Sequence, residues 1–82
     1  MIKMFYLKSC PYCKQAFKFL DELKDEFPNV EMTLIEETEQ PEIANAHDYY
    51  YVPTFYINDK KVHEGATSRE IIRDILKTNC EK

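Results

Sequence analysis

The chain has 82 residues, of which 44% are apolar and 13% aromatic, and it carries a formal net charge of −4. This length suits one domain, residues 1–82, and the composition is that of a globular rather than a disordered protein. The acidic balance argues against a nucleic-acid partner. Because no segment resembles a signal peptide or a membrane span, we expect a cytoplasmic protein without a membrane partner.

The first half of the chain predicts a strand, a helix and a second strand. The apolar run at residues 2–7 predicts the first strand, and Pro11 suits a first helical turn, where its missing N–H is not needed. From Cys13 onward, apolar residues recur at three- and four-residue spacing and predict an amphipathic helix of about four turns that ends at residues 27–29. Alternation at residues 30–35 predicts a second strand, which a short connection would place parallel to the first.

The second half of the chain predicts two strands and a further long helix. An acidic connection at residues 36–42 leads into a short helix near 41–48, and strands follow at 54–57 and 61–63 around a turn. Gly65 ends the last strand. Thr67 and Glu70 have the spacing of a capping box, with Thr67 as the N-cap of the final helix. The predicted order is therefore βαβαββα.

The motif Cys10-Pro11-Tyr12-Cys13 lies between the first strand and the first helix. This position places Cys10 at a helix N-terminus, where a thiolate is stabilised and becomes reactive. The chain has an odd number of cysteines, three, and a closely spaced pair in the cytoplasm is catalytic or metal-binding rather than structural. We predict that Cys10 is the nucleophile and that Cys13, one turn later, resolves the mixed disulfide.

Other functions of the cysteine pair stay open. A zinc site would need two more ligands, and the remaining candidates, His47, His63 and Cys80, lack a paired spacing. A non-catalytic carrier of a metal or an iron–sulfur cluster, bound through Cys10, is an alternative of a different class. We expect the two histidines to be surface or turn residues and Cys80 to be a bystander thiol. The tyrosines at 49–51 would either border the substrate groove or pack in the core.

The chain resembles a glutaredoxin of the dithiol type, a member of the thioredoxin-fold superfamily. The resemblance covers essentially the whole length and rests on Cys10-Pro11-Tyr12-Cys13 after the first strand, Val52-Pro53 before the third, and Gly65 before the last helix. It implies an α/β thioredoxin fold with a four-stranded mixed sheet flanked by three helices, and a cis peptide before Pro53. It also implies a monomeric thiol–disulfide oxidoreductase without a tightly bound cofactor, which uses glutathione to reduce protein disulfides and glutathionylated proteins.

The glutathione site that this resemblance implies is only partly present. Its expected contacts are Lys8, Tyr12, Val52, Pro53, Thr67 and Ser68. The first 18 residues hold four lysines and no acidic residue, which suits an anionic thiol substrate. Lys8 is two rather than the usual three residues before Cys10. Three further features depart from the family pattern: Tyr51 replaces the usual threonine, Glu64 replaces the first of two glycines, and Ala66-Thr67-Ser68 replaces the acidic or small residues that follow. The departures at Tyr51 and Glu64 keep open the alternative that thioredoxin reductase, rather than glutathione, supplies the electrons.

Overall fold

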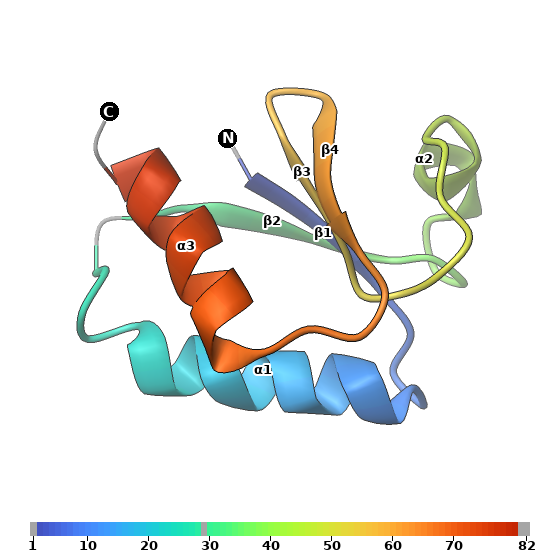
Figure 1. Ribbon diagram of the computed structural model, residues 1–82. Helices are drawn as coiled ribbons and strands as arrows, with labels where there is room; N and C mark the ends of the chain where they lie inside the picture. Colours follow the sequence, from blue (N-terminus) through green and yellow to red (C-terminus); the bar gives the residue numbers. More distant parts are fainter. Residues whose placement is uncertain (1, 29, 81–82) are drawn as a thin grey trace.

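A computed structural model describes the backbone of residues 2–28 and 30–80, with side chains to residue 78 (Figure 1). In chain order the elements are β1 (Ile2–Tyr6), α1 (Pro11–Leu23), β2 (Met32–Glu36), α2 (Pro41–Asn45), β3 (Thr54–Ile57), β4 (Lys60–Glu64) and α3 (Arg69–Cys80). The sheet order is β2-β1-β3-β4. β1 pairs with β2 in parallel, and the other pairs are antiparallel. The predicted element order and the four-stranded mixed sheet are confirmed.

The helices cover both faces of the sheet. Figure 1 shows α1 and α3 on one face and the short α2 on the other. The larger core lies beneath α1 and α3 and contains Ile2, Met4, Ala16, Leu23, Phe55, Ile72, Ile75 and Leu76. Successive residues of a strand point to opposite faces, so Phe5 lies in a smaller core with Ile35, Ala44 and Tyr56. No helix in residues 2–28 or 30–80 is long and apolar enough to cross a membrane.

Helix α1 begins where the sequence predicts and ends earlier. Pro11 is its first residue, and Cys10 is the extended N-cap residue, with φ −78° and ψ 122°. The predicted helix continued to residue 27, but α1 ends at Leu23. After Leu23 the chain forms a turn, in which the Leu23 carbonyl accepts the N–H groups of Glu26 and Phe27 at 3.0 and 3.1 Å. Phe27 still packs against the larger core.

The N-terminus of α3 differs by one residue from the predicted capping box. The Ser68 hydroxyl accepts the N–H of Ile71 at 3.2 Å, and the Ser68 carbonyl accepts the N–H of Ile72 at 3.1 Å. Ser68 is therefore the N-cap, and the third helical position is Ile71 rather than Glu70. The prediction of Thr67 as the cap was wrong, because the helix begins one residue later, with Ile72 fully buried.

Strand β2 and helix α2 also differ in their limits. β2 begins at Met32, and although Ile35 and Glu36 are buried, Leu34 is 46% exposed. Leu34 lines an open apolar groove of about 330 Å³ between this edge strand and α1. α2 ends at Asn45, three residues before the predicted limit.

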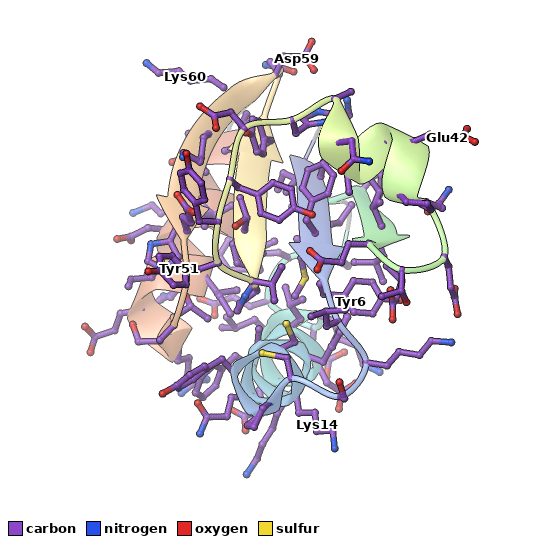
Figure 2. The ribbon with its side chains drawn as sticks, turned by 90° about the vertical axis from the view of Figure 1, so that its right-hand side faces the viewer. Tyr6, Lys14, Glu42, Tyr51, Asp59 and Lys60 are labelled. Carbon is purple, nitrogen blue, oxygen red and sulfur yellow. The ribbon has the colours of Figure 1, made fainter. Side chains whose placement is uncertain are left out.

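The hairpin turn between β3 and β4 agrees with the sequence. Its two residues, Asn58 and Asp59, have φ angles of +50° and +68°. Asn and Asp tolerate this left-handed region better than most residues do, and two such residues form the turn that matches the twist of a hairpin. The turn lies at the opposite end of the sheet from the start of α1, as the labels of Asp59, Lys60 and Lys14 show in Figure 2.

Candidate active site

The two cysteines lie where the N-terminus of α1 meets the loop that precedes β3. The Cys10 thiol donates to the Val52 carbonyl at a distance of 3.8 Å, and the Val52–Pro53 peptide bond is cis, as expected. Cys10 is partly exposed, whereas Cys13 is only 1% exposed. Both are free thiols. The structure therefore brings together Cys10, Cys13, Val52 and Pro53, four of the residues expected at this site.

Burial separates the chemistry of the two thiols. Loss of solvation raises the pKa of the Cys13 thiol to about 12, and a hydrogen bond with the Cys10 side chain adds to this rise. The backbone N–H of Leu7 favours the thiolate and opposes the rise. Cys13 is thus a protonated, buried thiol at neutral pH. Cys10 is the thiol that a substrate can reach, and its side chain makes no capping hydrogen bond with the first turn of α1.

The loop that carries Cys10 is fixed by the carboxylate of Glu36. Glu36 is 5% exposed and accepts the Lys8 N–H at 3.3 Å and both the N–H and the hydroxyl of Thr38 at 2.6 Å. The Thr38 hydroxyl is the main cause that lowers the pKa of this carboxyl group. The sequence predicted only an acidic connection at residues 36–42. The one local signal was an acid at the end of a strand with a threonine two residues later, a pattern typical of turns.

Lys8 and Tyr12, two of the expected glutathione contacts, lie on the surface. The Lys8 side chain is 66% exposed and forms an ion pair with Glu39, which raises the Lys8 pKa. Tyr12 is 53% exposed. The other two expected contacts, Thr67 and Ser68, lie in the segment that enters α3, where Ser68 caps the helix.

Glu64 binds the segment that precedes Val52. Its carboxylate accepts the backbone N–H groups of Tyr50 and Tyr51, the latter at 3.0 Å, and the ammonium of Lys61 at 2.8 Å. The Lys61 hydrogen bond, followed by that from Tyr50, lowers the pKa of Glu64 to about 2. Figure 2 looks onto the start of α1, with Tyr51 on one side of it and Tyr6 on the other. The sequence marked Glu64 as a departure from the family pattern but did not predict these bonds.

The tyrosine run divides between core and surface. The Tyr49 hydroxyl donates to Glu37 at 2.8 Å, its ring lies 5.0 Å from that of Phe5, and its burial raises its pKa. By contrast, Tyr50 and Tyr51 are 86% and 69% exposed. Tyr49 therefore packs against the core, whereas Tyr50 and Tyr51 lie on the surface.

The histidines have structural partners. The His47 ring lies 4.6 Å from that of Phe5, and its Nδ1 lies 2.9 Å from the Ile43 carbonyl. His63 Nε2 lies 2.9 Å from the Ala66 carbonyl. Within residues 2–28 and 30–78, no three side chains of His, Cys, Asp or Glu are grouped as a metal site would require. The side chain of Cys80 lies outside the described part of the chain.

Comparisons with known proteins agree with this fold. The sequence model of the thioredoxin domain matches residues 1–77. A thioredoxin of Methanocaldococcus jannaschii is 31% identical over 77 residues, which are 93% of this chain and 91% of that protein. Among solved structures, mitochondrial thioredoxin 3 of Saccharomyces cerevisiae in its oxidised form gives a TM-score of 0.74 at 23% identity, over 94% of this chain and 76% of that one.

Fasciola hepatica thioredoxin also gives a TM-score of 0.74, at 18% identity, over 95% of this chain and 78% of that one. The named relatives are thioredoxins, so these matches support the broader thioredoxin fold of the sequence-based prediction but not its narrower glutaredoxin assignment. The fold is that of thioredoxin-like thiol–disulfide oxidoreductases. With a match over nearly its whole length, the chain belongs to the thioredoxin domain family.

Proposed function

We propose that this chain reduces protein disulfides with the Cys10/Cys13 dithiol and is itself re-reduced by a dithiol flavoprotein reductase such as thioredoxin reductase. The observation that carries the proposal is the arrangement of the two sulfurs. Cys10 is accessible beside the Val52 carbonyl, and Cys13 is buried one helical turn later. This arrangement suits one thiol for attack on a substrate and the other for an internal second step.

The reaction then has two exchange steps. The Cys10 thiolate attacks one sulfur of the substrate disulfide, which forms a mixed disulfide and releases the other substrate sulfur as a thiolate. Cys13 gives up its proton, and its thiolate attacks the Cys10 sulfur, which releases the second substrate sulfur and leaves a Cys10–Cys13 disulfide. The released thiolates take up protons. The substrate has gained two electrons, and the reductase returns two electrons to the protein.

Two contacts favour a dithiol reductase over glutathione as the electron source. The amides of Tyr50 and Tyr51, which precede Val52, already bond to the Glu64 carboxylate. The ammonium of Lys8 already pairs with Glu39. A glutathione carboxylate would have to displace one of these internal anions, whereas an extended protein segment needs only the backbone beside Val52.

Glutathione-linked reduction, the function of a glutaredoxin, is the second candidate. The specific observation in its favour is Tyr12, which is 53% exposed next to Cys10 in the Cys-Pro-Tyr-Cys motif. The Lys8 side chain is also 66% exposed, so an incoming carboxylate can compete with Glu39 for it.

The experiment compares the two electron sources on the oxidised protein. NADPH consumption is measured with a protein disulfide as substrate, once with thioredoxin reductase and once with glutathione and glutathione reductase at physiological concentrations. We expect faster turnover with thioredoxin reductase, and none with either system for the Cys10→Ser variant. Faster turnover with glutathione would favour the second candidate. A visible absorption band in freshly purified protein would instead favour a cluster or metal carrier.

A further inference from the structure

We propose that Glu64 is a specificity-determining residue, whose carboxylate occupies the backbone amides of Tyr50 and Tyr51 and directs the dithiol toward disulfides with neutral or basic flanking residues. The inference rests on the proposed function, because it concerns which disulfides Cys10 attacks. It assigns to Glu64 the exclusion of substrates that carry a negative charge beside the reactive sulfur.

Both oxygens of the Glu64 carboxylate accept hydrogen bonds from this chain. One oxygen accepts the adjacent N–H groups of Tyr50 and Tyr51, and the other accepts the ammonium of Lys61. The side chain is 19% exposed. Two consecutive backbone N–H groups directed at one oxygen form a concavity that binds anions. Here the chain's own carboxylate fills it, so a substrate carboxylate would find these donors taken.

This concavity adjoins the groups that meet the substrate. Tyr51 directly precedes Val52, whose carbonyl lies 3.8 Å from the Cys10 sulfur. Gly65 directly follows Glu64 and donates its N–H to the Pro53 carbonyl at 2.9 Å. The Glu64–Tyr51 contact is therefore linked to the Val52–Pro53 segment on both sides. On one side the link is the peptide bond from Tyr51 to Val52, and on the other it is the hydrogen bond from Gly65 to Pro53. A substrate strand that lies along Val52 passes the Glu64 carboxylate within a few residues of its disulfide.

The charge of Glu64 persists at neutral pH and is only partly offset. Its pKa of about 2 keeps it ionised, and its cationic partner Lys61 bonds to the oxygen that the two amides do not use. A substrate anion near Val52 therefore meets a like charge, and the Tyr50 and Tyr51 amides that could have bound it are already occupied. A basic flanking residue meets an attractive charge instead.

The test is a single-turnover reaction of the reduced protein, in a Cys80→Ser background, with mixed-disulfide peptides. Three peptides differ only in whether Glu, Gln or Lys flanks the cysteine. The wild-type site should react fastest with the Lys peptide and slowest with the Glu peptide. In Glu64→Gln, the rate for the Glu peptide relative to the Gln peptide should rise by about three- to tenfold, the effect of removing a screened like charge. In Lys61→Gln the same ratio should fall.

The matched control is Glu42→Gln, which removes the same charge from α2, where the Glu42 side chain points outward (Figure 2). Its ratio should stay at the wild-type value. In the wild-type protein, added salt should bring the rates for the Glu, Gln and Lys peptides closer together. This measurement does not depend on how any variant folds. Equal slowing of all three peptides by Glu64→Gln, or a salt-independent ratio, would overturn the specificity role. A wild-type protein that reacts with none of the peptides would instead overturn the proposed function.

Discussion

Removal of Cys10 should leave an active-site thiol, Cys13, that is almost unreactive in the folded protein. The reason is its environment: Cys13 is 1% exposed, and burial is the largest cause of its raised pKa. A rise from 9.0 to about 12 lowers the thiolate fraction at neutral pH by about a thousandfold, since each unit is a factor of ten. Cys10→Ser removes the smaller contributions of the Cys10 thiol but leaves burial in place.

The assay is alkylation by iodoacetamide, followed by intact mass spectrometry, of the Cys10→Ser, Cys80→Ser variant. We expect Cys13 to react at least about a hundredfold more slowly in the folded protein than in urea, because only the exposed thiolate is alkylated. The matched variant, Cys13→Ser with Cys80→Ser, should be alkylated rapidly at Cys10 while folded. Alkylation of folded Cys13 at nearly its rate in urea would refute the assignment of Cys13 as the buried, protonated partner.

Three stability measurements test the surroundings of the site. Ser68→Ala should lower the free energy of unfolding in urea by about 1 kcal/mol, and Thr67→Ala by clearly less, because Ser68 caps α3. The reverse order would support Thr67 as the cap instead. Gly65→Ala should lower the free energy of unfolding by about 1–2 kcal/mol, because the φ of Gly65 is +91°. A steric clash adds nothing to this cost, since the nearest atom to an added Cβ, the Cβ of Tyr51, is 3.7 Å away. A gain in stability would contradict this prediction. Above pH 9 the unfolded chain loses the Cys13 proton while the folded protein keeps it to about pH 12. Between about pH 9 and pH 12 the free energy of unfolding of the reduced protein should therefore fall by up to about 1.4 kcal/mol per pH unit. Below pH 9 the Cys13 thiol should cause no change with pH, and in Cys13→Ala the fall should be less steep. Equal slopes in the two proteins would contradict the raised pKa.

The local parts of the fold were predictable because short sequence patterns determine them. Pro11 marked the start of α1, and the spacing of Ile72, Ile75 and Leu76 marked the buried face of α3. Adjacent Thr67 and Ser68 can both cap a helix, so the sequence did not distinguish them. The helix start at Arg69, with Ile72 buried, selects Ser68.

The site likewise contains residues that a local sequence pattern predicts and contacts that it does not predict. Cys10 and Cys13 are close in sequence, so one helical turn determines their relation. Val52 and Pro53 could be placed only through the resemblance to a known family. The bonds of Glu36 to Lys8 and of Glu64 to Tyr51 join residues 28 and 13 positions apart, and they depend on how the loops pack around the finished sheet. A pattern of residue types along one chain does not contain that information.

Reaction of the Cys10→Ser and Cys13→Ser variants with a protein disulfide, in a Cys80→Ser background, tests most directly whether Cys10 is the nucleophile that Cys13 resolves. Mass spectrometry follows covalent adducts, and the released substrate thiols are counted. Cys13→Ser should accumulate a mixed disulfide at Cys10, and Cys10→Ser should form none and release no thiol. Thiol release by Cys10→Ser, or the absence of a trapped adduct on Cys13→Ser, would contradict this mechanism.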